Sequence, residues 1–221
     1  MKNNLSILLK SVVLSIIVMF LFFVSCKEEE VNSFSGTVYD MSSGDAVEGV
    51  KVYLDASKVS ASSINSAFVQ LAETTTDASG KYFLECENDT YLKFRLRFEK
   101  DDFHSSSNEI TPQDYAWDYT FEKYFARESF IFVRILNILP NDDADEFKIK
   151  IVGINELCTE CGSGSFKYYY GSFVDTSFQC KTVGGDSILI YSISIHDDES
   201  IIKENKVFCI PGDTVFYNCY Y

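Results

Sequence analysis

One segment in the middle of the chain alternates strictly between apolar and charged side chains. The apolar members are Leu92, Phe94, Leu96 and Phe98, and the residues between and after them are Lys93, Arg95, Arg97 and Glu99. Successive side chains of a β-strand point to opposite faces of the sheet, so this period of two predicts a strand with one buried face and one wet face. Shifting the pairing by one residue would bury three cations, which constrains the register strongly.

The rest of the chain favours the same class of structure. It contains 19 Phe and 14 Tyr but only 3 Pro, and β-branched residues recur in short runs, as is typical of strands. Further alternating runs cover 131–135, 147–151 and 189–195, and a Pro-Gly-Asp turn leads into 215–219. In the third run the alternating set is Leu189, Tyr191, Ile193 and Ile195. We therefore expect an all-β protein.

Three segments near the start carry a resemblance to a known family: 36–40 (GTVYD), 47–52 (VEGVKV) and 75–82 (TTDASGKY). In the last, Asp77 can cap a turn and Gly80 can adopt the left-handed backbone that closes a hairpin. In this order they resemble the carboxypeptidase regulatory-like domain, a transthyretin-like β-sandwich, over residues 34–105. The chain departs from that pattern at Ala46-Val47, where the family often has a Pro. The resemblance implies the fold and a passive accessory or binding role.

Composition divides the chain into five parts. We expect an export signal over 1–25, an acidic tether over 26–33, a transthyretin-like or immunoglobulin-like sandwich over 34–105, a connecting segment over 106–126 and a second β-sandwich region over 127–221. The spacing of the strands beyond residue 127 is typical of sandwiches. Two packed sandwiches are the favoured arrangement, and one elongated sandwich is the alternative.

The first 26 residues predict a lipid anchor. A basic start precedes an apolar stretch of about fourteen residues, which is short of the roughly 20 that span a bilayer and has the layout of an export signal. The four residues from Phe23 to Cys26 resemble a bacterial lipobox, although Leu is commoner at the Phe23 position. The resemblance implies that the Cys26 thiol carries diacylglycerol, whose buried methylenes each contribute about 0.8 kcal/mol to anchoring. An uncleaved anchor helix is the alternative.

The tract after Cys26, Lys27 followed by three Glu, resembles the acidic signal that sends lipoproteins of Bacteroidota to the cell surface. This implies an outer-membrane, surface-exposed location. A periplasm-facing protein with a solvated tether is the alternative.

The net charge of the mature chain argues against nucleic acid as a partner. Removing residues 1–25 removes Lys2 and Lys10, leaving 17 basic against 33 acidic residues, or about −16. Affinity for phosphate backbones comes from clustered Lys and Arg, and the sequence has no such cluster. Adsorption to anionic lipid is disfavoured for the same reason, which leaves the lipid on Cys26 as the membrane contact.

With Cys26 lipidated, six cysteines remain: Cys86, Cys158, Cys161, Cys180, Cys209 and Cys219. An even number in an exported protein indicates disulfides, although six cysteines allow fifteen pairings. Buried free thiols are one alternative. A zinc site built from Cys158, Cys161, Cys180 and Cys209 is another, but the sequence has one CxxC pair where the usual signature has two. We expect no metal and no cofactor.

Two histidines are candidates for a catalytic base, because each has acids close in sequence. His104 follows Asp101 and Asp102, and His196 precedes Asp197 and Asp198. Both are expected on exposed loops, and the sequence contains no HExxH, Walker or nucleophile-elbow motif. We therefore expect a non-enzymatic protein, with a hydrolase as the less favoured alternative.

An acidic turn concentrates oxygen donors that could bind calcium. It contains Asn141, Asp142, Asp143, Asp145 and Glu146. The EF-hand spacing is absent, so a solvated turn is the favoured interpretation.

Two aromatic residues are the candidates for a binding site. In the segment 166–173, Phe166, Tyr168 and Tyr170 are expected to fill a core and to leave Tyr169 available for stacking. Trp117 is expected as a plug at a domain interface or as a ligand platform. Core or inter-domain packing is the favoured interpretation for Tyr169, and the interface plug is the favoured one for Trp117.

These observations predict a membrane-anchored cell-envelope lipoprotein that acts as a surface binding or structural accessory. The partner would be an envelope protein, a host protein or a glycan. An accessory subunit of a nutrient-uptake system is the alternative, because the N-terminal extension of TonB-dependent transporters resembles the same domain.

Overall fold

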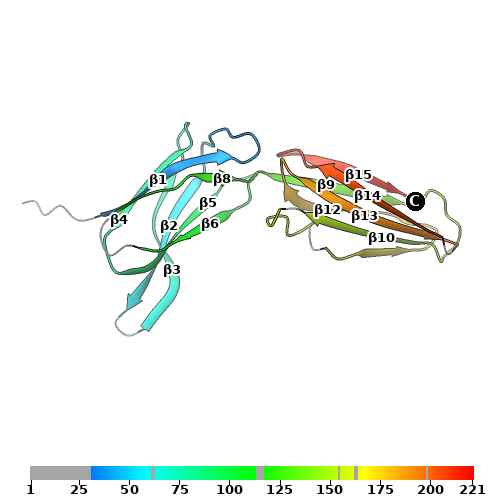
Figure 1. Cartoon of the computed structure of the whole chain (residues 1–221), viewed down its shortest axis with the longest axis horizontal. Coiled ribbons are helices and arrows are strands. Elements are labelled where there is room, and N and C mark those ends of the chain that lie inside the picture. The colour runs from blue at the N-terminus through cyan, green and yellow to red at the C-terminus, as the bar shows by residue number, and fades with distance from the viewer. Residues whose placement is uncertain (1–30, 61–62, 113–116, 154, 162–163, 198) are drawn as a thin grey trace, which may run out of the picture.

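The structure is a computed structural model that describes residues 31–60, 63–112, 117–153, 155–161, 164–197 and 199–221. These residues form fifteen β-strands, and none of them lies in an α-helix (Figure 1). This confirms the all-β class. Within the same ranges no helix could cross a membrane. Residues 1–30, including the predicted lipidation site Cys26, lie outside the described residues.

The first β-sandwich is built from eight strands in two sheets. One sheet has the order β4-β1-β7, with β8 also paired to β1, and the other has the order β3-β2-β5-β6. The strands of the first sheet are β1 (Val31–Asp40), β4 (Lys81–Glu87), β7 (Asp118–Thr120) and β8 (Lys123–Phe125). The strands of the second are β2 (Lys51–Ser60), β3 (Ser63–Thr75), β5 (Tyr91–Glu99) and β6 (Ser106–Ile110).

The second β-sandwich has one sheet of three strands and one of four. The three-stranded sheet has the order β12-β9-β15, in which β15 runs parallel to β9, and the other has the order β11-β10-β13-β14. The first consists of β9 (Glu128–Leu136), β12 (Asp175–Val183) and β15 (Thr214–Tyr220). The second consists of β10 (Glu146–Gly153), β11 (Lys167–Tyr170), β13 (Ser187–His196) and β14 (Glu199–Phe208).

Each sandwich has its own hydrophobic core, as the favoured arrangement of two sandwiches requires. The first core includes Phe34 of β1 and the inward residues of β5. The second includes Ile131 of β9 and Ile149 of β10. In β5 the predicted alternation holds at Phe94, Leu96 and Phe98, which are fully buried, whereas Leu92 near the start of the strand is exposed. Figure 1 shows the two sets of strands as separate bodies joined at the start of β9.

The boundaries of the first sandwich differ from those expected. The segment 106–126, expected as a connection, supplies β6, β7 and β8 to the first sandwich, and β1 already begins at Val31 within the expected tether. β7 and β8 both pair with β1 in parallel, and the Ser33 N–H donates to the Trp117 carbonyl over 3.0 Å. These two strands have three residues each, too few to show an alternating pattern.

The predicted turn around Gly80 is present, but the flanking strands do not form the expected hairpin: β3 pairs with β2 and β4 pairs with β1, so the turn joins the two sheets of the first sandwich. The Asp77 carboxylate accepts the backbone N–H groups of Ser79 and Lys81 at 2.8 and 2.9 Å. Gly80 has a φ of 72°, and a Cβ there would lie 2.6 Å from the Val38 carbonyl oxygen. Both the backbone angle and the close approach require Gly at this position.

The two sandwiches touch at their junction. Arg127, just before β9, forms an ion pair with Asp40 of β1 at 2.9 Å. On the other side, the His104 Nε2 lies 3.1 Å from the Thr182 carbonyl oxygen of β12. A Cβ on Gly185 would lie 2.7 Å from the Ser42 Cβ, so the turn after β12 packs closely against the turn after β1. These contacts link the end of one sandwich to the beginning of the other.

Candidate functional site

The outer surface of the four-stranded sheet in the second sandwich is unusually apolar. In β13 the buried, inward side chains are Ile188, Ile190, Ser192 and Ser194. The alternate side chains, Leu189, Tyr191, Ile193 and Ile195, therefore point outward and are only partly covered. The strand therefore buries two serines beside Ile188 and Ile190. Its outward side carries four large apolar side chains, where an ordinary surface strand has polar ones.

The inward hydroxyl groups have a local explanation. Ser192 and Ser194 line a pocket of about 360 Å3 together with Lys203, Asn205 and other residues. The inner side of β13 is therefore polar where it meets this pocket. That explains the inward serines but not the apolar outer surface.

Neighbouring strands extend this surface on both sides of β13. Cross-strand pairing aligns Tyr168 of β11, Lys148 of β10, Ile193 of β13 and Ile202 of β14 in one row. The next row contains Tyr170, Glu146, Ile195 and Ser200. We call the surface formed by these two rows, by the row Lys150, Tyr191 and Glu204 and by Leu189 the outer face. Its most exposed members are Ile202 at 71%, Tyr170 at 67% and Tyr168 at 53%.

Two lysines lie among the aromatic rings of the outer face. The Lys150 Nζ is 5.8 Å from the Phe166 ring and 5.9 Å from the Tyr191 ring, and the Lys148 Nζ is 5.7 Å from the Tyr168 ring. Lys148 also meets the Glu146 carboxylate at 3.2 Å. Lys150 forms no ion pair with any residue that the structure describes. The outer face therefore combines apolar area with one cation that has only ring contacts.

The structure reverses the expected facing of the tyrosine-rich segment. Tyr169 pairs with the buried Phe147 and packs, half-buried, against the second core, and burial raises its pKa. Tyr168 and Tyr170, expected in the core, are exposed. The prediction that Tyr169 is available was wrong because three consecutive Tyr carry no alternation. The register is instead set by the inward Phe147 and Ile149 of the neighbouring strand.

Trp117 is a packing residue of the first sandwich and not an exposed ligand platform. Its ring lies 6.0 Å from Phe34 and 5.2 Å from Tyr119, both in edge-to-face geometry. It is partly buried against the first core. The indole N–H is buried without a hydrogen-bond partner in the structure. Trp117 therefore plugs the first sandwich itself, and the contacts between the sandwiches come from other residues.

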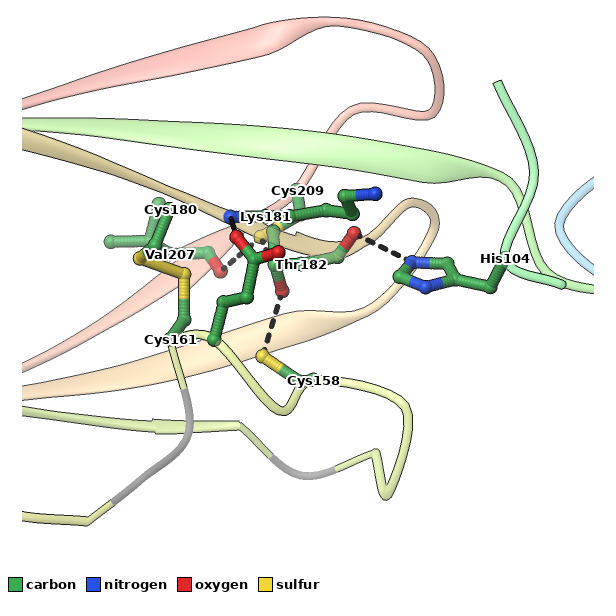
Figure 2. The surroundings of a disulfide bond; sticks show 9 residues. His104, Cys158, Cys161, Cys180, Lys181, Thr182, Val207 and Cys209 are labelled. Carbon is green, nitrogen blue, oxygen red and sulfur yellow. Dashed lines mark hydrogen bonds between the residues drawn. A yellow bond between two sulfur atoms is a disulfide. The ribbon is translucent and has the colours of Figure 1, made fainter. Parts of the chain in front are cut away.

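A cluster of cysteines lies in the second sandwich near the junction (Figure 2). Cys161 and Cys180 form a disulfide, which confirms the prediction that disulfides are present. Among the described residues four cysteines are free: Cys86, Cys158, Cys209 and Cys219. A zinc site of four thiolates is contradicted, because the disulfide takes two of the sulfur donors.

Two of the free thiols meet at one hydroxyl group. The Cys158 sulfur lies 3.2 Å from the Thr182 Oγ1, and the Cys209 sulfur lies 4.0 Å from the same oxygen. All three residues are buried. The sequence suggested a group of these two cysteines with Cys161 and Cys180. It gave no indication that Thr182 lies beside them, because that position depends on the pairing of distant strands.

The histidines do not have the partners expected from sequence. His104 contacts a backbone carbonyl at the junction. His196 Nδ1 lies 2.9 Å from the Oδ1 of the buried Asp145, and not against the neighbouring Asp197. Burial raises the pKa of Asp145, but hydrogen bonds from the Asn141 N–H, Asn137 and His196 outweigh it and hold that pKa below its usual value. In the described part of the chain, no Ser, Thr or Cys side chain forms a hydrogen bond with His196.

The acidic turn uses its carboxylates for local structure. Asp142 accepts the Ala144 N–H at 2.7 Å, Asp143 accepts the Ser172 hydroxyl at 3.2 Å, and Asp145 is buried as described. Within the described ranges, no three or more His, Cys, Asp or Glu side chains are grouped to hold a metal ion. These carboxylates are therefore engaged in local hydrogen bonds of the turn.

Comparison with known proteins yields weak likenesses only. No family model and no curated protein matches the chain. Among solved structures, the shaft pilin SpaA of Lactobacillus rhamnosus GG matches with a TM-score of 0.33 and 8% identity, covering 87% of this chain and 97% of that one. The minor pilin GBS52 of Streptococcus agalactiae matches with a TM-score of 0.37 and 10% identity, covering 86% and 94%.

An enzyme appears at the same level of similarity. The 3-chlorocatechol 1,2-dioxygenase of Rhodococcus opacus matches with a TM-score of 0.34 and 9% identity, covering 46% of this chain and 62% of that one. Likenesses this weak assign neither an activity nor an assembly to the chain.

Proposed function

We propose that the chain is a non-enzymatic, lipid-anchored protein of the cell envelope whose second sandwich binds a protein partner through the outer face. The observation that carries this proposal is the outward orientation of Leu189, Tyr191, Ile193 and Ile195. Contiguous apolar area rimmed by polar residues is typical of protein interaction sites. Isolated exposed apolar residues are ordinary, but four half-buried, outward-facing ones in one strand beside the exposed Tyr168, Tyr170 and Ile202 are not.

The charge of the outer face indicates the chemistry of the partner. Lys150 has ring contacts and no ion pair with a carboxylate within the described residues. A carboxylate of the bound protein could therefore form an ion pair with it. The partner is therefore an apolar protein surface that carries at least one carboxylate opposite Lys150. Complementary charge of this kind sets orientation and association rate more than it sets affinity.

The location is part of the proposal and is supported by the sequence of residues 1–30. A lipobox-like Cys26 followed by Lys and three Glu favours an outer-membrane lipid anchor at the cell surface, with the periplasm as the alternative. A partner that is an outer-membrane transporter would make the chain an accessory of nutrient uptake.

Site-specific photo-cross-linking in living cells tests the proposal. A photoreactive amino acid at Ile202 is expected to give one discrete protein adduct, and adding Lys150→Glu is expected to remove it. The matched control is the same probe at Val69 of β3, which is 61% exposed on the first sandwich. An adduct that disappears on deglycosylation would instead identify a glycan as the ligand. Equal labelling from positions 202 and 69 would contradict a binding role for the outer face.

A further inference from the structure

Two buried thiols from different parts of the second sandwich lie against the same hydroxyl group. Cys158 is in the loop after β10, and Cys209 directly follows β14. Their sulfurs are 3.2 and 4.0 Å from the Thr182 Oγ1, so they are close neighbours in space although 51 positions separate them in sequence. Figure 2 shows both thiols beside Thr182, near the Cys161–Cys180 disulfide.

The backbone holds each of these cysteines in place. The Cys209 N–H donates to the Asp186 carbonyl and its carbonyl accepts the Gly185 N–H, both at 2.8 Å. Cys158 is three residues from Cys161, which the disulfide ties to β12. A Cβ on Gly153 would lie 2.5 Å from the Cys158 sulfur, so this side chain is closely packed. The approach of the two sulfurs is therefore a feature of the fold.

We propose that Cys158 and Cys209 are the partners of a second disulfide, formed outside the cytoplasm by exchange with an external disulfide. That external disulfide can be oxidised glutathione or the active-site disulfide of a thiol oxidase. Compartments beyond the cytoplasm sustain such bonds. Both sulfurs lie within 4.0 Å of the Thr182 Oγ1, which places them on the two sides of one hydroxyl group.

The chemistry needs two exchange steps. The deprotonated thiol of Cys158 attacks one sulfur of glutathione disulfide, forms a mixed disulfide and expels one glutathione thiolate. The deprotonated thiol of Cys209 then attacks the Cys158 sulfur and expels the second glutathione thiolate. Two electrons pass from the cysteines to the oxidant, and the two thiol protons end on the released glutathione molecules.

The structure disfavours the other pairings. Cys86 lies in β4 of the first sandwich. Cys219 is buried in β15. No contact between Cys219 and another cysteine sulfur is found among the described residues. Of the free cysteines that the structure describes, Cys158 and Cys209 are the two that meet at a shared atom.

Oxidative refolding followed by peptide mapping tests this assignment. The full-length chain, purified in detergent, is reduced, unfolded and refolded in a mixture of reduced and oxidised glutathione. It is then unfolded, alkylated without reduction and digested. Mass spectrometry is expected to find a Cys158–Cys209 peptide pair beside the Cys161–Cys180 pair, with Cys86 and Cys219 alkylated. Of the four free thiols that the structure describes, two thus remain alkylatable.

Two variants make the result specific. Cys219→Ala is the matched control and is expected to retain the new peptide pair. Cys209→Ala is expected to leave Cys158 alkylated or carrying glutathione. The proposal is overturned if Cys158 and Cys209 are both alkylated while the Cys161–Cys180 bond is intact, or if Cys158 is found joined to Cys161.

Discussion

Asp55 is the buried carboxylate that organises the charges on β2 and β5. Its Oδ2 accepts hydrogen bonds from Arg95 Nη2 and Arg97 Nε, each at 2.7 Å, and the two guanidinium groups lie over the rings of Phe68 and Tyr53. Burial raises the pKa of Asp55, but the bonds from Arg97 and Arg95 outweigh it and hold that pKa below 3.8. The strict register of β5 therefore depends on one acid as well as on apolar burial.

Replacing Asp55 by Asn is expected to destabilise the first sandwich by about 2 kcal/mol at pH 7, because two arginines lose their charged partner. A folded-state pKa below the unfolded value adds stability above the unfolded pKa, and this stability is lost as pH falls through the folded pKa. The difference between Asp55→Asn and the native chain should therefore shrink below pH 3.8. Urea unfolding at pH 7 and pH 3 measures the unfolding free energies of the native chain and of Asp55→Asn. An equal difference between them at both pH values would contradict a stabilising role for the Asp55 charge.

Gly80 offers a second test at the same scale. Gly80→Ala forces a side chain into a left-handed backbone and against the Val38 carbonyl. We expect a loss of at least about 1 kcal/mol of unfolding free energy. Gly44 is the matched control, since its φ is 78° and a Cβ there meets nothing within 4 Å. A loss from Gly80→Ala no larger than that from Gly44→Ala would show that the close approach to Val38 costs nothing.

At the scale of strands, the pattern of the sequence predicted some faces and not others. In β5 and β10 one face is apolar and the other charged, so burial follows the alternation. In β11 and β13 both faces carry large, uncharged side chains, so the sequence does not show which face is buried. The pairing with the neighbouring strands sets the register instead. The disulfide was expected, but its partners Cys161 and Cys180 depend on a loop packing against β12, which spacing does not encode.

The register of β11 is testable with two adjacent substitutions. Tyr169→Ala removes a ring that packs against the second core and is expected to cost about 2 kcal/mol, whereas Tyr170→Ala is expected to stay within about 0.5 kcal/mol. Thermal and urea unfolding of the two variants give the comparison. A larger loss for Tyr170→Ala would show that the strand faces the other way.

The Cys161–Cys180 bond is the covalent link between the loop after β10 and β12. It closes a loop with a sequence separation of 19 residues. Removing such a constraint from the unfolded chain costs about 3 kcal/mol. The double variant Cys161→Ala, Cys180→Ala should lose that amount relative to the oxidised chain, and reductant should then remove only what the proposed Cys158–Cys209 bond contributes. Equal stability of the oxidised native chain and the double variant would contradict a stabilising role.

At the level of the whole molecule, the two sandwiches have separate cores and share a small junction. We therefore expect them to unfold partly independently of each other. The side-chain polar links there are the Asp40–Arg127 ion pair and the His104–Thr182 contact, beside the backbone bond from the Glu128 N–H to the Asp102 carbonyl. Arg127→Ala with His104→Ala removes both side-chain links, each of which contributes on the order of 1 kcal/mol, and is expected to split heat unfolding into two separated transitions. Calorimetry of the double variant measures this, and a profile identical to that of the native chain would show that the polar links do not couple the sandwiches.

The proposed role of the outer face is to bind an apolar protein surface that carries a carboxylate opposite Lys150. The most direct measurement is the affinity of the cross-linked partner, once purified, for the native chain and for variants by titration calorimetry. We predict at least a tenfold weakening, or about 1.4 kcal/mol, for both Lys150→Glu and Ile202→Glu, and no change for Val69→Glu. Equal affinity of all four proteins for the partner would contradict the account.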